Sequence, residues 1–381
     1  MTAAPTVAAF SVSAEQRQLR DALRSVLSSR SPSTRVRALM ATGNPFDMPL
    51  WEVLTTQMGL TGLMIPEEYG GVGASFAEAA IVCEELGRSL ACVPYLSSAV
   101  LSAALVLECG TDSARRTWLP RIAAGDRRLT VALIDAGSSS WDPDQVTLAV
   151  EDGTDGPEVT GTKRFVIDGM ACDDVLVVAR HNGGLSLVRV AASERGTERA
   201  PLTVLDQTRG LAELEFRAAP AQLISAPGEA SAGIARARLF AAAAVVAESV
   251  GGAERCLEMA VAYAKTRYQF GRLIGSYQAI SHRCADMLAS LELARSASQY
   301  AAHVLSTEAS DHERVVAVST AKAFTSQAYL EIAGDNIQIH GGIGFTWEHD
   351  AHLYFKRAKS NHQLFGDPVE HRQVLARELK I

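Results

Sequence analysis

The segment Arg267-Tyr-Gln-Phe-Gly-Arg-Leu-Ile-Gly-Ser-Tyr-Gln278 lies between two stretches whose apolar residues recur at helical spacing. It offers a guanidinium, an aromatic ring, a glycine and an amide within a short length of chain. This set suits a dinucleotide, because arginine binds phosphate oxygens, phenylalanine stacks on adenine and glutamine pairs with polar edges. Taken alone, the segment is more typical of an ordinary loop between helices, with Gly271 as a cap.

A second segment, Gln338-Ile-His-Gly-Gly-Ile-Gly-Phe-Thr-Trp-Glu348, carries three closely spaced glycines. Such glycines let a backbone approach a ligand and leave N–H groups available to phosphate. The plainer interpretation is a helix C-cap followed by a turn. His340 lies inside this segment and receives no predicted role.

The regions around both segments predict long helices. One apolar stripe predicts a helix through residues 239–264, a second helix is expected over 277–306, and a third to about 334. The third begins at Ser310-Asp-His-Glu313, a capping-box pattern. Long helices joined by short loops favour a bundle. The stripe consists of Leu239, Ala243, Val246, Val250, Ala253, Leu257, Ala260 and Ala264.

The rest of the chain falls into regions that differ in the spacing of their apolar residues. Residues 13–27, 50–58 and 77–90 read as helical. The centre instead has short β-type runs separated by Gly, Asp and Asn, which predict a small, mainly antiparallel β-domain. We therefore expect an α+β, mostly helical protein with domains at 1–125, 126–228 and 229–381. The β-type runs are 146–150, 165–167, 175–179 and 185–190.

Together, in this order, the two segments resemble the R-x-x-F-G…Q and Q-x-x-G-G-x-G-F-[TN] motifs of the acyl-CoA dehydrogenases. Pro66-Glu-Glu-Tyr-Gly-Gly and Glu84-Glu85-Leu are similar to further segments of that family, and the resemblance covers essentially the whole chain. It implies a helical domain, a β-domain and a four-helix bundle, with FAD as cofactor, acyl-CoA as substrate and an electron-transferring flavoprotein as acceptor. It also implies a set of FAD-binding residues, namely Arg267, Gln269, Phe270, Ile274, Gln278, Gln338, Gly341 and Gly342.

The catalytic base of the family has no counterpart at either usual position. The reaction removes an α-proton with a carboxylate while the β-hydride passes to the flavin. Counting from the second motif places the usual glutamate at Phe365, and counting back from the first places the alternative at Ala241. Neither side chain accepts a proton. Glu248 is a tentative catalytic candidate, and an ion pair with an arginine inside the bundle is the other interpretation. For Asp367 we prefer a turn or cap role.

The β-domain departs from the family as well. Where relatives carry a T-E-P-x-x-G-S-D loop, this chain has Ile134-Asp-Ala-Gly-Ser-Ser-Ser-Trp141, and Phe165-Val-Ile167 replaces a W-[ST] pair. The hydroxyl donors expected to hold the flavin are therefore reduced, with Ser138 to Ser140 as candidate substitutes.

Retention of one half of the cofactor site and loss of the other favours a subunit of a heteromeric α2β2 dehydrogenase. The chain resembles subunits of actinobacterial steroid side-chain dehydrogenases, as in the segment from Phe345 to Tyr354. The alternatives are a self-sufficient homodimer or homotetramer with a relocated base, and a scaffold that binds acyl-CoA or a repurposed flavin oxidase. The identity of the acyl group stays open.

Composition excludes several other classes. The net charge is −7 with no long basic run, which disfavours nucleic-acid binding. The longest apolar stretch, 239–247, is far shorter than the roughly 20 residues of a membrane span. Six scattered cysteines predict free thiols in the cytoplasm. No metal is expected, because the four C-terminal histidines His349, His352, His362 and His371 lack ligand spacing.

Overall fold

The computed structural model describes residues 12–154 and 156–381. The chain forms two compact units, and both are interleaved in sequence. Unit 1 comprises Met1–Ser33, Phe76–Ala91 and Ala242–Ile381, and unit 2 comprises Thr34–Ser75 and Cys92–Ala241. The α+β, mostly helical class is confirmed. The three domain boundaries expected from the sequence stay a prediction.

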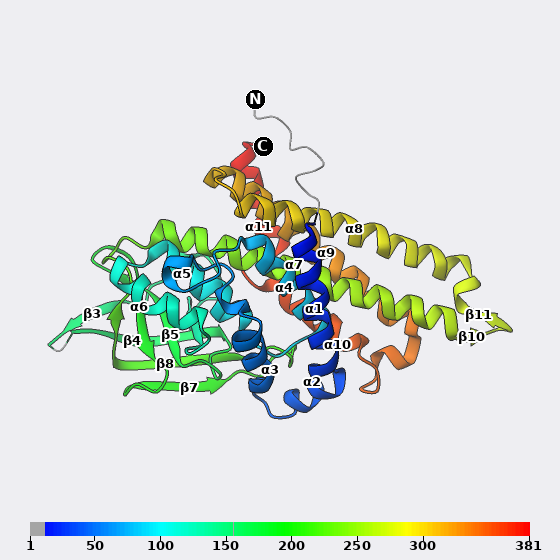
Figure 1. The fold of residues 1–381 in the computed structure, drawn as a ribbon, viewed down its shortest axis with the longest axis horizontal. Helices are drawn as coiled ribbons and strands as arrows, with labels where there is room; N and C mark the ends of the chain where they lie inside the picture. The colour runs from blue at the N-terminus through cyan, green and yellow to red at the C-terminus, as the bar shows by residue number, and fades with distance from the viewer. Residues whose placement is uncertain (1–11, 155) are drawn as a thin grey trace. The chain divides into compact units, whose positions relative to one another are not determined.

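Unit 1 is helical (Figure 1). Capping boxes start three of its helices, at Ser13, Ser310 and Asp367, as the side-chain pattern at Ser310 predicts. The predicted end of the third long helix near residue 334 is wrong, because α9 continues for six residues to His340. Its helices are α1 (Ala14–Arg30), α4 (Phe76–Ser89), α7 (Ser231–Thr266, which begins in unit 2), α8 (Gln278–Leu305), α9 (Asp311–His340), α10 (Ala351–Gln363) and α11 (Pro368–Leu379).

Helices α4 and α7 approach each other through two glycines. A Cβ at Gly251 of α7 would overlap the carbonyl oxygen of Glu84, and one at Gly87 of α4 would overlap the carbonyl oxygen of Glu248. Only glycine permits two helix backbones to come this close. The contact fixes the position of Glu248, one of the sequence-predicted candidates.

Charged side chains surround this contact. Glu85 is buried and accepts two hydrogen bonds from Arg24, at 2.8 and 2.6 Å. Because several partners share each carboxylate, the network joins α1, α4, α7 and α8. Its other pairs are Arg20 with Glu84, Arg295 with Glu84 and Glu254, and Arg88 with Glu254 and Glu258.

Unit 2 contains two mainly antiparallel sheets, in the strand orders β1-β5-β6-β9 and β2-β4-β8-β7, with β3 paired to β4. Only β1 and β5 pair in parallel among these strands. The strands are β1 (Leu129–Ala132), β2 (Ile134–Asp135), β3 (Val150–Gly153), β4 (Gly156–Ile167), β5 (Asp174–His181), β6 (Gly184–Ala191), β7 (Thr197–Pro201), β8 (Leu211–Pro220) and β9 (Gln222–Leu223). The helices of this unit are α2 (Ser33–Met40), α3 (Met48–Glu52), α5 (Ala103–Cys109) and α6 (Asp112–Ala123).

One predicted strand is displaced. Of the run 146–150, only Val150 belongs to a strand, β3, and Ala149 forms an isolated parallel bridge with Arg180. A side chain from earlier in the sequence explains this, since the Asp135 carboxylate accepts the backbone N–H groups of Thr147 and Leu148 at 2.6 and 3.0 Å. Those N–H groups are therefore satisfied without a partner strand.

Each unit buries one lysine. Lys163 in unit 2 donates to the carbonyl of Leu133 at 2.9 Å and to Asp135 at 2.6 Å. Lys322 on α9 in unit 1 donates to Ser326 Oγ at 3.1 Å and to the carbonyls of residues 361 and 366, both at 2.9 Å. Burial lowers the pKa of Lys322 from 10.5 to about 7, although the charges of Asp367 and Glu370 oppose that shift.

Within the described ranges, every helix is too short or too polar to cross a lipid bilayer.

We predict that Gly251→Ala destabilises the protein by at least about 2 kcal/mol, because the added methyl overlaps a carbonyl that cannot move away. Gly334→Ala is the control, since its Cβ would meet only Phe355, at 4.0 Å. An alanine inside a helix should raise stability by up to about 1 kcal/mol. Urea denaturation of both variants tests the contrast, and equal effects would contradict it.

Lys322 should make stability depend on pH. Its folded pKa of about 7 lies below the ordinary 10.5, so between these values the unfolded chain holds a proton that the folded chain has released. The free energy of unfolding therefore rises with pH across this window, by roughly 1 kcal/mol per unit from this residue. Lys322→Met should lower that slope in denaturation series from pH 7 to 10, and parallel slopes in the two proteins would refute the prediction.

Candidate functional site

The first motif forms a β-hairpin at the far end of α7 and α8 (Figure 1). Strands β10 (Tyr268–Gln269) and β11 (Arg272–Leu273) are antiparallel, and Phe270 and Gly271 form the turn with φ of 50° and 82°. These left-handed conformations match the right-handed twist of the two strands. The turn projects Phe270 into solvent, where its side chain is 93% exposed.

Contacts within the chain hold the hairpin at its base. Tyr277 Oη donates to the carbonyl of Gln269 at 3.1 Å, and the Arg272 guanidinium lies 3.8 Å from the centre of the Tyr277 ring. The backbone N–H of Ile274 donates to the carbonyl of Arg267 at 2.9 Å. These contacts leave the side chains of Arg267 and Phe270 exposed.

The second motif is the end of α9 followed by a 3-10 turn over Gly341–Phe345. Gly341 has φ 63°, and a Cβ at Gly341 or Gly342 would meet no atom within 4 Å. Gln338 is exposed on the last turn of the helix. The backbone here is thus open to an approaching ligand.

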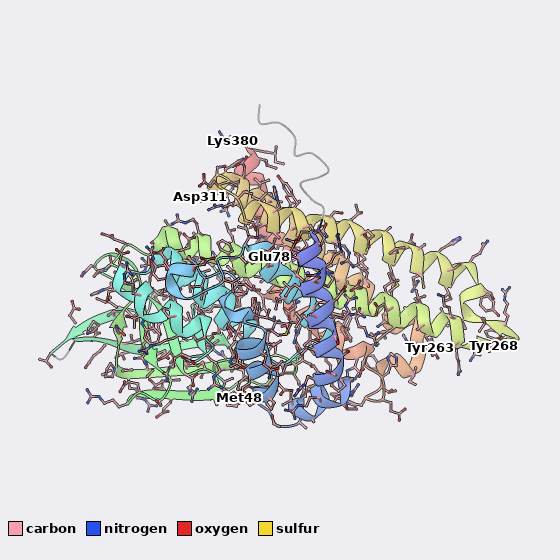
Figure 2. The ribbon with its side chains drawn as sticks, viewed as in Figure 1. Met48, Glu78, Tyr263, Tyr268, Asp311 and Lys380 are labelled. Atoms are coloured by element: carbon pink, nitrogen blue, oxygen red, sulfur yellow. The ribbon has the colours of Figure 1, made fainter. Side chains whose placement is uncertain are left out.

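A ring stack brings the two motifs together. Tyr263, four residues before Arg267, stacks on His340 with ring centres 4.5 Å apart, and His340 lies 4.1 Å from His349. Figure 2 shows Tyr263 and Tyr268 at this end of unit 1. Sequence reasoning gave Tyr263 no role, although its position one turn before Arg267 was a usable signal.

His340 donates a hydrogen bond back to its own helix. Its Nδ1 lies 2.8 Å from the carbonyl oxygen of Asn336, which only accepts, so Nδ1 carries a proton. Burial lowers the pKa of His340, against that hydrogen bond, which raises it. The imidazole packs between the rings of Tyr263 and His349.

Seven of the eight predicted cofactor residues are exposed at this end of unit 1, and we call them the candidate adenosine half-site. They fit part of a dinucleotide chemically, because they combine a guanidinium, a free aromatic face, three amides and open glycine backbone. Ile274 differs, since it is buried under the hairpin. The seven are Arg267, Gln269, Phe270, Gln278, Gln338, Gly341 and Gly342.

The two usual base positions hold buried apolar side chains. Phe365 is 2% exposed in unit 1, and Ala241 is fully buried on the part of α7 that belongs to unit 2. Asp367 caps α11 by accepting the N–H groups of Val369 and Glu370, both at 2.8 Å. This is the cap role preferred from the sequence.

Glu248 forms an ion pair inside unit 1. Arg357 Nη1 of α10 donates to Glu248 Oε1 at 2.5 Å, and the two residues are 2% and 8% exposed. Asn361, one turn along α10, donates to Ser249 Oγ at 3.1 Å. The carboxylate of Glu248 is thus turned toward α10 and held there by a buried guanidinium.

The loop predicted to face the flavin keeps its hydroxyls within its own turn. Ser138 Oγ accepts the N–H of Ser140, and Ser140 Oγ accepts the N–H of Asp142. Phe165 interrupts β4 with φ 55°, at an irregularity of the β4–β8 register. A bulky residue in this conformation is strained, so unit 2 holds this position at a cost in energy.

Two family descriptions match the sequence. Residues 13–126 match the N-terminal domain of acyl-CoA dehydrogenases, and residues 234–380 match their C-terminal domain. The chain is 35% identical over 364 residues to acyl-CoA dehydrogenase IpdE2 of Mycobacterium tuberculosis, covering 95% of this chain and 96% of that protein. It is 32% identical to acyl-CoA dehydrogenase FadE27 of the same organism, covering 88% of each.

Solved structures give the same result. The ChsE4–ChsE5 complex from Mycobacterium tuberculosis contains a chain with a TM-score of 0.86 and 27% identity, covering 97% of this chain and 98% of that one. A steroid acyl-CoA dehydrogenase, Tcur3481–Tcur3483, has a TM-score of 0.86 at 26% identity, covering 97% and 99%. This chain therefore belongs to the acyl-CoA dehydrogenases, the family of oxidoreductases whose cofactor is FAD.

Proposed function

We propose that this chain is one subunit of a heteromeric, FAD-dependent acyl-CoA dehydrogenase that converts an acyl-CoA thioester to the 2,3-enoyl-CoA. It contributes the adenosine half-site to FAD held mainly by a paralogous subunit, and that subunit supplies the base. The observation that carries the proposal is the contrast between an exposed half-site and two base positions filled by Phe365 and Ala241.

Each residue of the half-site has a defined task in this proposal. Arg267 would bind phosphate oxygens, and Phe270 would stack on the adenine ring, since its face is open to solvent. The backbone at Gly341 and Gly342 would approach the pyrophosphate closely. FAD, when bound, supplies the hydride acceptor, and an electron-transferring flavoprotein is the proposed oxidant of the reduced enzyme.

The relatives named above support an assembly of two different chains. One structural neighbour is a complex of two proteins, ChsE4 and ChsE5. The other, Tcur3481–Tcur3483, is named as a steroid acyl-CoA dehydrogenase and also carries two protein names. Because one of these neighbours is named for steroids, we propose that the substrate carries a steroid-linked or other bulky acyl group. An α2β2 tetramer is the proposed stoichiometry, with a homo-oligomer as the competing one.

A self-sufficient enzyme with Glu248 as base is the second candidate. The ion pair with Arg357 weighs against it, because proton abstraction would leave the guanidinium buried beside a neutral acid. Glu248 therefore has a structural role in the favoured proposal.

The spectrum of the purified chain tests the proposal first. We expect a colourless protein alone, and bound oxidised flavin that bleaches with an acyl-CoA after co-expression with a paralogue that keeps the carboxylate. Flavin reduction by the chain alone would favour the self-sufficient enzyme. Absence of reduction by any acyl-CoA, with or without the paralogue, would favour the binding scaffold.

Phe270→Ala and Arg267→Ala should each weaken FAD retention by the co-purified complex by about 10-fold, because each removes roughly 1.5 kcal/mol of stacking or charge-assisted hydrogen bonding. Phe324→Ala is the matched control, since this phenylalanine is 39% exposed on α9 away from both motifs. Flavin content after dialysis gives the readout. Equal retention in all three variants would remove the half-site from the proposal.

Glu248→Gln separates the two candidates. The heteromeric proposal expects flavin reduction in the complex within about 3-fold of the parent protein, but a loss of about 3 kcal/mol or more in stability, since Arg357 loses its partner. The double variant Glu248→Leu with Arg357→Met should recover most of that stability. A reduction rate lowered by several orders of magnitude in a stably folded variant would assign the base to Glu248.

A further inference from the structure

The turn between α10 and α11 has an unusual backbone. Phe365 and Gly366 both have positive φ, 59° and 104°. Left-handed backbone is costly for phenylalanine, and the cost is met only where surrounding groups hold the residue in place. The sequence of this turn does not explain it, because a glycine occupies only the second position.

Lys322 of α9 holds one side of the turn. Besides the carbonyls of Asn361 and Gly366, both at 2.9 Å, its ammonium lies 3.4 Å from the carbonyl of His362. An ammonium has three protons to donate, and these carbonyls bracket the turn before and after Phe365. Ser326, one helical turn along α9, completes the set.

His371 of α11 holds the other side. Its Nε2 lies 3.1 Å from the carbonyl oxygen of Phe365, which can only accept, so Nε2 carries a proton. Its Nδ1 lies 3.1 Å from Ser319 Oγ on α9. A Cβ at Gly366 would approach Nε2 of this histidine to 3.0 Å, which explains the glycine.

We infer that Lys322 and His371 are positioning residues that together fix the backbone of residues 364–366, and with it the direction of the side chain at position 365. Lys322 belongs to α9 and bonds to Ser326 of that helix, and His371 bonds to Ser319 of the same helix. One helix therefore fixes the position of the turn. The inference rests on the proposed function in one respect, because the significance of position 365 comes from counting along the chain from the second family motif. The geometry itself does not depend on it.

The charged and titratable groups around the turn are few. Asp367 and Glu370 raise the pKa of Lys322, whereas burial lowers it to about 7. Burial and the charge of Lys322 lower the pKa of His362. Lys322 therefore changes charge near neutral pH, and its neutral amine would keep two N–H donors for the turn.

An alternative explanation is that Lys322 only caps the C-terminal end of α10, whose last carbonyls it binds. In that case its loss would loosen α10 and leave position 365 unchanged. A positioning role instead predicts a local change at the turn that reaches the Phe365 ring.

Amide hydrogen exchange on the full chain, followed by mass spectrometry, tests the inference without flavin, substrate or partner. We expect Lys322→Met to raise exchange at residues 364–367 at least 10-fold, and Ser319→Ala at least 3-fold through the loss of the hydrogen bond between Ser319 and His371. Lys359→Met is the control, because Lys359 is an exposed lysine on α10, and it should leave exchange at residues 364–367 unchanged.

The 19F resonance of fluorophenylalanine at position 365, assigned by its absence in Phe365→Leu, reports the ring itself. It should shift or broaden in Lys322→Met and Ser319→Ala but not in Lys359→Met. Unchanged exchange and an unchanged resonance would overturn the inference, as would faster exchange spread evenly over unit 1. If Lys322→Met does not fold, Ser319→Ala decides the question. A complex that fails to bind FAD bears on the proposed function only.

Discussion

The close approach of α4 and α7 at Gly87 and Gly251 constrains most of unit 1. With no Cβ between the two backbones, each helix presses a glutamate carbonyl against a glycine of the other, and Glu84, Glu85 and Glu248 are carried into the interior. Burying carboxylates is costly unless each has a partner. The arginines of α1, α8 and α10 provide those partners, so a steric feature of two glycines determines where the charges of three other helices lie.

The same constraint bears on chemistry. Glu248 is the one acidic side chain that sequence reasoning could offer as a base, and its backbone is locked by Gly87 while its carboxylate is held by Arg357. A base must be free to take and release a proton beside its substrate. The residues that remain available at the surface are instead those suited to binding, beyond the C-terminal end of α7, whereas the glycine contact with α4 lies near the middle of that helix.

Sequence reasoning found the helices α1, α4, α7, α8 and α9 of unit 1, because a stripe at spacings of three and four and the Ser310–Glu313 cap are local signals. It failed where a distant side chain decided the outcome. The segment 146–150 has strand-like residues, yet the Asp135 carboxylate accepts the N–H groups of Thr147 and Leu148, which lie 12 and 13 residues further along the chain. Strand β8 was missed although Ala212, Leu214 and Phe216 alternate into the core, so that signal was present in the sequence.

Within the candidate site, the motif residues could be read from their order, but their surroundings could not. The partner of Glu248 lies 109 residues further along the chain, and the carbonyls around Lys322 lie 39 to 44 residues away. No local pattern marks such pairs. Gly334 gave a false signal, because glycine is typical of helix ends and the predicted helix was ended there. In the structure, Gly334 lies inside the continuous helix α9.

The exposed ring of Phe270 makes the relative amounts of the two proposed subunits important. Phe345 and Trp347 are also 80% and 61% exposed, so an orphan copy of this chain would carry several aromatic rings in water. Exposed apolar groups on separate copies associate with one another. Expression of the two subunits from a single transcript, in equal amounts, would keep such copies rare, and an excess of this chain alone would be cleared as a misassembled protein.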